Sequence, residues 1–502
     1  MIRLSLLFLF ILAACALTAT EPTSVPTATP TRALQTTLIP TAERRFQIVS
    51  TQVIEEESQD CVVTTAQLAQ YVVQADIDYA ARTAEVTQSI RYPNVGTAAL
   101  NDIILDVEPN RVAGAFVLDA VRLDGQIAEP VLDARRLTVP LAEPLAPGCE
   151  VRIDLRFSLR VPAVAEGRAG FTGYFGYTSR QLNLGHWLPV VAYRANDEWV
   201  THDVLAIGEQ TVTELADWQV NMRLLNAPED VEIAAPGTTS RPTTDTYRFE
   251  QRARDVAVSI SDQFAKRIAT GENGVTVELY TLGDPQPEAA AHALDAAVRS
   301  QAMYSDLFGA YPNERLVIVE GDFPDGMEFS GLMFVGTNWF INWTGSAQSY
   351  LTIITVHEVS HQWWYARVGS DQATTPWLDE ALATYSEFIF YEEYYPDLRD
   401  WWWQFRVYSF VPLGFADIEP VSSSVYRFEN VRQYINAVYL RGAVMLGQLR
   451  NDLGTDDFFA WLAAYAQAGD GQVVTPNTLW ALLTPEQLAA TEATRAQYLA
   501  AP

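Results

Sequence analysis

Two histidines and a glutamate have the spacing of a metal-binding motif. In HEVSHQWW, His357 and His361 stand four positions apart, so on a helix both imidazoles leave one face and can meet one divalent ion. Glu380, in WLDEALATYSE, follows after 18 intervening residues. This distance lets the first helix stop near Gly369 and a second helix return with its carboxylate facing the histidines. Two histidines, a glutamate and an open fourth position are the arrangement of catalytic zinc, so we predict one Zn²⁺ ion here.

Two further glutamates lie close to this motif. Glu358 follows the first histidine and can reach a water molecule held on the ion, which suits a general base. Glu387 lies seven residues after Glu380, hence on the same helical face, and could orient a ligand histidine. An exposed helix glutamate is the alternative for Glu387. The alternative for the whole motif is a chance HExxH, against which the spacing and context of Glu380 argue.

Composition indicates a globular protein and argues against two classes of partner. The 502 residues suffice for two or three domains, and a hydrophobic content of 49% indicates that most of the chain is globular. The net charge of -29 argues against a nucleic-acid partner and against attachment to anionic lipid through a basic surface.

The N-terminus resembles an export signal. Arg3 precedes an apolar run over 4–14 that is too short for a comfortable membrane span. The run closes as LAAC, which resembles the bacterial lipobox, so residues 1–15 are predicted to be a lipoprotein signal with Cys15 as the lipidated residue. An ordinary cleavable signal with an incidental cysteine is the alternative. Residues 16–60, rich in Thr and Pro at their start, are predicted to tether an extracytoplasmic protein to the cell membrane.

The two remaining cysteines are Cys61 and Cys149. In an oxidising compartment they could form a disulfide that clamps the first domain, or they could be two buried free thiols. No second long apolar segment is present, so we expect no transmembrane helix.

The hydrophobic pattern changes near Gly274 and predicts a multidomain α+β chain. Residues 61–268 contain segments of period two, such as YVVQADIDY and VRIDLRFSL, and are predicted to form an antiparallel β domain of sandwich or saddle form. Residues 269–502 are predicted to form a mainly helical domain that contains the motif. Its expected helices cover 288–307, 377–395, 433–451 and 455–468, and its expected strands cover 275–280, 316–320 and 332–335.

From about Gly326 to Leu449 the sequence resembles the zinc aminopeptidases typified by aminopeptidase N and leukotriene hydrolase, peptidase family M-one of the gluzincins. The resemblance implies a thermolysin-like catalytic domain behind an N-terminal β saddle. It also implies that the two motif histidines and Glu380 bind zinc and that Glu358 is the catalytic base. The chain ends at Pro502, so we expect it to lack the C-terminal helical-repeat domain of larger relatives and to have a more open cleft.

Two more segments carry the resemblance. YLRG, from Tyr439, resembles the family's Tyr-x-Lys-Gly, whose tyrosine hydrogen bonds to the oxyanion of the tetrahedral intermediate, with arginine here in place of lysine. DGMEF aligns with Gly-x-Met-Glu-Asn, so Gly326 and Met327 are predicted to line the substrate site and Glu328 to bind the substrate's α-ammonium group. Asp325 and Phe329, the first and last residues of this segment, depart from the glycine and asparagine of the family pattern.

The resemblance implies an aminopeptidase that hydrolyses peptides with a free N-terminus. Two other classes of function remain open at this point. One is a zinc endopeptidase of the same fold with an altered amine site, and the other is a non-catalytic cell-surface binding protein that retains the fold.

Overall fold

The computed structural model describes residues 61–165, 171–411 and 418–500. The predicted signal segment, Cys15 and the tether lie outside these residues. The described residues form one compact unit. Within the described part, no helix has the length and apolar character needed to cross a membrane.

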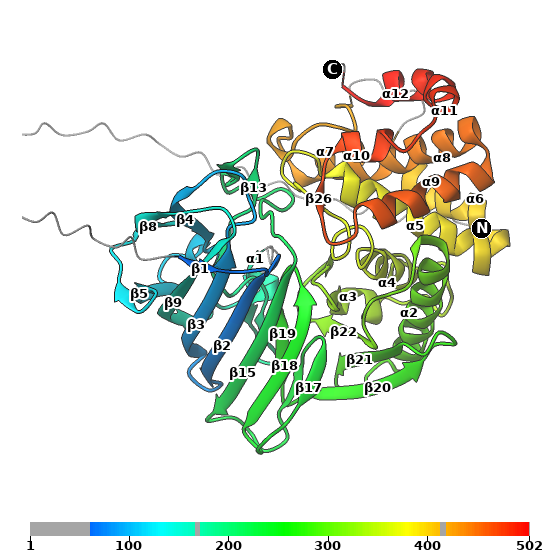
Figure 1. Cartoon of the computed structure of the whole chain (residues 1–502). Coiled ribbons are helices and arrows are strands. Elements are labelled where there is room, and N and C mark those ends of the chain that lie inside the picture. The colour runs from blue at the N-terminus through cyan, green and yellow to red at the C-terminus, as the bar shows by residue number, and fades with distance from the viewer. Residues whose placement is uncertain (1–60, 166–170, 412–417, 501–502) are drawn as a thin grey trace, which may run out of the picture. The chain divides into compact units, whose positions relative to one another are not determined.

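The N-terminal region is built on a nine-stranded sheet (Figure 1). Its centre is formed by β15 (Ala216–Leu225), β2 (Ala69–Asp78), β3 (Thr83–Pro93) and β9 (Cys149–Arg160). Buried residues alternate with more exposed ones along β9 and β15, as the period of two predicts. The pairings are antiparallel except between β15 and β2, which run parallel. The other strands are β1 (Val62–Val63), β5 (Phe116–Leu123), β6 (Gln126–Ile127), β17 (Thr238–Ser240) and β18 (Thr246–Ala253).

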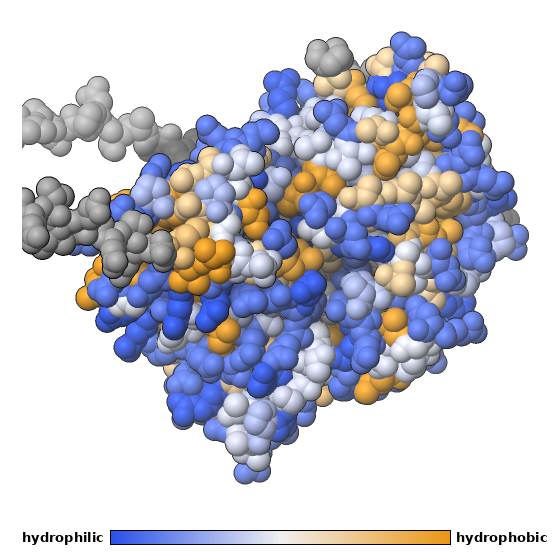
Figure 2. All heavy atoms as spheres, in the orientation of Figure 1, coloured by the Kyte–Doolittle hydropathy of each residue, from blue (hydrophilic) through white to orange (hydrophobic). Residues whose placement is uncertain are grey.

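Two four-stranded sheets share a buried core with this large sheet. Side chains such as Val73 and Phe157 of the large sheet pack in one cluster with Ile103 and Leu184 of the small ones. Over β2, β15 and β18, the face shown in Figure 2 is largely hydrophilic. The small sheets contain β10 (Phe175–Tyr177), β11 (Leu182–Leu184), β19 (Val258–Ser261) and β16 (Glu232–Ala234), and β12 (Val190–Val191), β4 (Leu100–Asp106), β8 (Arg136–Leu145) and β7 (Val131–Asp133).

Cys61 and Cys149 form a disulfide, which confirms the first of the two alternatives. The bond joins the residue before β1 to the first residue of β9. It closes a loop with a sequence separation of 88 residues.

A five-stranded sheet leads into the helical region and positions the substrate segment. Its order is β20 (Phe264–Thr270), β21 (Thr276–Leu282), β22 (Arg315–Gly321), β24 (Leu332–Gly336) and β23 (Gly326–Met327). The connection from β21 to the parallel β22 is α2 (Pro287–Phe308), close to the predicted 288–307. β23 pairs antiparallel with β24 at the end of the sheet, so the DGMEF segment lies at an edge.

The helices that follow hold the motif. α4 (Tyr350–Ser360) carries the first histidine and α5 (Trp377–Tyr394) carries the glutamates. The predicted end of the first helix near Gly369 is wrong, because α4 ends at Ser360 and the chain turns at once. Trp363 and Trp364 in this turn are fully buried, and they pack against side chains of α2.

The predicted helix over 433–451 is interrupted. It consists of α7 (Val431–Tyr434), the π-helical segment η5 (Ile435–Leu440) and α8 (Arg441–Leu453). A second π-helical segment, η3 (Trp403–Tyr408), follows α6 (Arg399–Trp402). The remaining helices include α3 (Thr337–Ile341), α9 (Thr455–Ala468), α10 (Pro476–Trp480), α11 (Pro485–Ala490) and α12 (Glu492–Tyr498).

Candidate metal centre and active site

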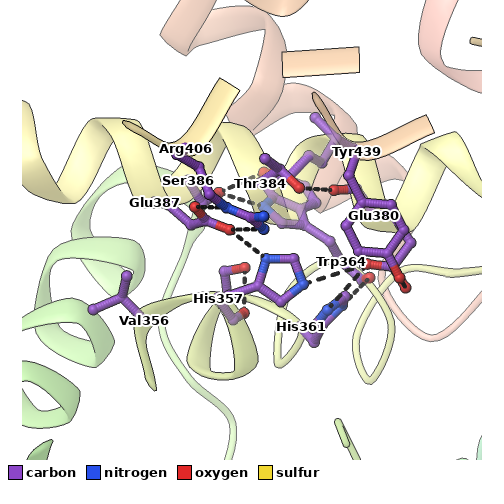
Figure 3. A network of polar contacts seen from close by, with 12 residues as sticks. Val356, His357, His361, Trp364, Glu380, Thr384, Ser386, Glu387, Arg406 and Tyr439 are labelled. Atoms are coloured by element: carbon purple, nitrogen blue, oxygen red, sulfur yellow. Dashed lines mark hydrogen bonds and ion pairs between the residues drawn. The ribbon is translucent and has the colours of Figure 1, made fainter. Parts of the chain in front are cut away.

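Three predicted ligands converge on one point (Figure 3). His357 lies in the last turn of α4, His361 is the residue that caps its C-terminus, and Glu380 lies in the first turn of α5. The Oε2 atom of Glu380 is 3.3 Å from Nε2 of His357 and 3.7 Å from Nε2 of His361. One ligand atom from each residue lies within 4.8 Å of the others. Although the helix ends at Ser360, the imidazole of His361 still meets that of His357, as their four-residue spacing predicts.

Each histidine is held by a carboxylate at its other ring nitrogen. Nδ1 of His357 is 2.9 Å from Glu387, and Nδ1 of His361 is 2.6 Å from Asp379. Because a carboxylate accepts a hydrogen bond, Nδ1 carries the proton and the Nε2 lone pair faces the common point. The predicted contact of Glu387 with a ligand histidine is thus present. Asp379 was not predicted, although an acid directly before the ligand glutamate was a visible signal.

The donor set fits a divalent metal such as zinc. Oε2 of Glu380 and Oε2 of Glu358 are buried and have no hydrogen-bond partner in the protein. Buried carboxylate oxygens normally have partners, so these two require a cation, a water molecule or a substrate group. Two imidazole nitrogens and one carboxylate, with Glu358 beside them, are the ligand types of a catalytic zinc site.

The pKa shifts follow from burial and from neighbouring charge. Burial raises the pKa of Glu358 to about 7, although the two histidines lower it. Burial alone would also raise the pKa of Glu380, but the imidazoles of His357 and His361 beside it and the hydroxyl of Tyr439 lower it below its usual value. Glu358 therefore has an affinity for protons that suits a base working near neutrality, whereas Glu380 remains an anionic ligand.

Glu387 accepts four hydrogen bonds and so uses both of its oxygens fully. Oε1 accepts from Nδ1 of His357 and from Nη2 of Arg406, each at 2.9 Å. Oε2 accepts from Nε of Arg406 at 2.9 Å and from the indole of Trp402 at 3.2 Å. The side chain is completely buried. Arg406 and Trp402 were missed, because an arginine in an aromatic segment gives no sequence signal of this role.

Tyr439 lies at the same centre, as predicted. Its hydroxyl donates to Oε1 of Glu380, and its ring is parallel to that of His357 with centroids 5.9 Å apart. Tyr434, five residues earlier, contacts the Tyr439 ring edge-on at 5.4 Å. Because the hydroxyl of Tyr439 lies beside a predicted ligand carboxylate, it is well placed to donate a hydrogen bond to a developing oxyanion of the substrate.

A second group of carboxylates adjoins the metal ligands. Oxygens of Glu209, Glu328 and Glu380 lie within 4.8 Å of one another. Burial and the carboxylates of Glu380 and Asp379 raise the pKa of Glu209 to about 8, and burial with neighbouring acids raises that of Glu328 well above its usual value. Gln372 links the groups, since its amide donates to Glu328 and to Asp379. Glu209 was missed, because a lone glutamate in the β region has no motif around it.

The rest of the DGMEF segment supports this arrangement. A Cβ atom on Gly326 would lie 2.1 Å from Oε1 of Glu358, so the backbone approaches the base closely. Met327 is predicted to line the substrate site, but its side chain is buried in a hydrophobic cluster that includes Phe329. Asp325 has φ of 71°, the left-handed region that favours glycine, which gives a physical reason for glycine in the family pattern.

Comparisons with known proteins agree with this geometry. Residues 292–495 match the family model described as "Peptidase family M1 domain". Endoplasmic reticulum aminopeptidase 1 of Mus musculus is 28% identical over 236 residues, which is 45% of this chain and 25% of that protein. Aminopeptidase M1-A of Oryza sativa subsp. japonica is 27% identical over 222 residues, or 42% of this chain and 25% of that protein. The match thus spans about a quarter of the length of these relatives.

Solved structures extend the similarity to most of the chain. A mutant of the M1 zinc metallopeptidase from Deinococcus radiodurans has a TM-score of 0.61 and 19% identity, covering 87% of this chain and 96% of that one. A second structure of it, with a Tyr-Ser-Ala substrate, has a TM-score of 0.61 at 18% identity with the same coverage. At this identity the likeness establishes the fold. Residues 292–495 are thus similar to the M1 peptidase domain, and these relatives and solved structures are named as aminopeptidases or M1 zinc metallopeptidases.

Proposed function

We propose that this protein is a zinc-dependent aminopeptidase that removes N-terminal residues from peptides. The observation that carries the proposal is the pair of adjoining groups: a His357, His361 and Glu380 ligand set, with Glu328 and Glu209 beside it. The ligand set suits a metal ion that activates water for attack on a peptide carbonyl. The two neighbouring glutamates suit binding of the substrate's α-ammonium group. Because the two groups adjoin, the bond placed at the metal would be the first peptide bond of the substrate.

The chain's own residues supply the remaining steps. When bound, zinc provides a Lewis acid that polarises the scissile carbonyl and lowers the pKa of water. Glu358 accepts a proton from the attacking water and then passes it to the leaving amine, for which a pKa of about 7 is suited. The hydroxyl of Tyr439 donates a hydrogen bond to the oxyanion of the tetrahedral intermediate. Glu387 and Asp379 keep the two histidines in the tautomer that presents Nε2.

The buried carboxylates explain the requirement for a free amine. The closeness of Glu209, Glu328 and Glu380 disfavours their joint ionisation, and a substrate ammonium group among them would stabilise the ionised carboxylates and form charge-assisted hydrogen bonds. An N-acetylated peptide has no such charge and would leave the carboxylates uncompensated.

The test is hydrolysis of aminoacyl reporter amides in free and N-acetylated form. We expect turnover of the free amides, at least about 100-fold lower kcat/KM for the acetylated ones, and loss of turnover after removal of the metal. Glu358→Gln should bind metal normally and lose nearly all turnover. Equal rates on both substrate forms would refute the aminopeptidase proposal and identify an endopeptidase. Absence of turnover by wild-type protein loaded with zinc would support a binding protein that keeps the fold.

We also propose that the protein is exported and anchored to the cell membrane as a lipoprotein. The support is the LAAC sequence that ends at Cys15 after a short apolar run, together with the disulfide, which suits an oxidising compartment. Expression in a bacterium with radiolabelled palmitate should label the wild-type protein and leave Cys15→Ser unlabelled. Equal labelling of both, or of neither, would refute the anchor.

A further inference from the structure

A buried cluster of charged side chains lies in the β region and does not include the metal ligands. Glu108, in the 3-10 turn η1 (Glu108–Arg111), pairs with Arg111 at 3.2 Å and with Arg135. Arg135 also lies 3.5 Å from Asp106, the last residue of β4. Asp106, Glu108 and Arg135 are 6%, 3% and 5% exposed. Buried ion pairs of this kind add little net stability, but they fix the groups that they contact.

This charged cluster binds the segment 200–215, which has no helix or strand. Nη2 of Arg111 donates to the carbonyl oxygen of Leu205 at 3.1 Å. The hydroxyl of Thr211 donates to Oε1 of Glu108 at 2.7 Å. The charged cluster therefore holds the segment at points on both sides of Glu209.

Hydrogen bonds also hold the residues next to Glu209. Arg135 donates to the carbonyl oxygen of Gln210 at 3.3 Å. The side chain of Gln210, which is 1% exposed, donates to the carbonyl oxygens of Ile207 at 2.8 Å and Gly208 at 2.7 Å. These bonds define the backbone before and after Glu209, so they set where its carboxylate lies.

The same segment also contacts the helical region. His202 is 2.9 Å from the carboxylate of Asp371, a few residues before α5. The hydroxyl of Tyr426 donates to the carbonyl oxygen of Asp203 at 2.7 Å. The segment thus joins the β region to the region that holds the metal ligands.

Glu209 lies among acids whose ionised forms would repel its own carboxylate. Its carboxylate lies within 4.8 Å of Glu328 and Glu380, both acidic, and an irregular segment could relax away from them. We propose that Arg111 and Arg135 are positioning residues, which act through the backbone of 200–215 to keep Glu209 beside Glu328 for recognition of the substrate's N-terminus. This inference rests on the proposed aminopeptidase function.

The test is a double-mutant cycle between Arg111→Met and Glu209→Gln, read as kcat and KM on a free aminoacyl amide. We expect Arg111→Met to raise KM by about tenfold with kcat and metal content close to wild type. On the Glu209→Gln background, the same substitution should have less than about a twofold further effect. Arg111→Lys should recover part of the loss. Arg122→Met, at an exposed arginine of β5, is the matched control and should leave KM unchanged.

A folding defect is separated by thermal unfolding of each variant. If Arg111→Met does not fold, Thr211→Val removes one bond to Glu108 without removing a charge, and it should show a smaller KM effect of the same non-additive kind. Fully additive effects, or a loss confined to kcat, would overturn the inference while leaving the proposed function intact. A wild-type enzyme that does not distinguish free from acetylated amides would refute the proposed function itself.

Discussion

Replacing Glu387 by glutamine should weaken metal binding, although Glu387 is not a predicted ligand and contacts only the far ring nitrogen of the ligand His357. Its four lone-pair directions accept from four donors: Nδ1 of His357, the indole of Trp402, and Nε and Nη2 of Arg406. An amide has the same shape but only one acceptor end. Whichever way the glutamine turns, its NH₂ group must face two of these donors.

The size of the effect follows from that count. Two buried donors without an acceptor cost about 1–3 kcal/mol each, so the free energy of unfolding should fall by about 2–6 kcal/mol. The loss of the charge that holds Nδ1–H of His357 should lower metal affinity by about 10- to 100-fold. That range corresponds to about 1.4–2.7 kcal/mol of binding free energy.

The assay is competition for zinc with a chromophoric chelator, alongside chemical denaturation of the same samples. Glu393→Gln is the matched control, because it is the same substitution at an exposed position of α5. We expect the control to match the wild-type protein in both measurements. A zinc affinity of Glu387→Gln within twofold of wild type, in a folded protein, would refute the view that the carboxylate orients His357.

Three further outcomes are expected. Tyr439→Phe should lower kcat by about 100- to 1,000-fold with zinc content unchanged, since it loses one oxyanion donor; steady-state kinetics and metal analysis would show this. Cys149→Ser should lower the free energy of unfolding by about 4–5 kcal/mol in denaturant titrations, from the entropy of the loop of 88 residues that the bond to Cys61 closes. Burial raises the pKa of Asp106 to about 6 from 3.8, so its contribution to stability is full below pH 3.8 and is lost as the pH rises through 6. The unfolding free energy of Asp106→Asn minus that of wild type should therefore rise by up to about 3 kcal/mol between pH 4 and pH 6, and a flat difference would contradict this.

Local patterns in the sequence predict much of the fold and of the metal centre. Alternation of apolar residues predicted β2 and β9, and helical periodicity predicted α9 to the residue. The spacing of the histidines and Glu380 predicted the ligand set because four positions on a helix leave little geometric freedom. These predictions succeed where the interacting residues are close in sequence or belong to a defined motif.

The missed residues depend on contacts between distant segments. Glu209 reaches Glu328 from an irregular connection whose path is set by side chains of the β region. Arg406 meets Glu387 from a segment that the sequence gives no reason to place there. Neither carries a local pattern, so only the tertiary structure could reveal their place at the site.

The position of Tyr439 shows how a small departure from regular structure shapes the site. A helix of period 3.6 places residues four apart on one face, whereas the i→i+5 bonds of a π-helical turn bring residues five apart together. Tyr434 and Tyr439 are five apart across η5, and their rings meet at 5.4 Å. Trp403 and Tyr408 are also five apart across η3, and their stacked rings have centroids 5.9 Å apart. Each π-helical segment also directs one polar side chain to a carboxylate of α5, so the interruption of the predicted helix is what aims Tyr439 at the metal ligand.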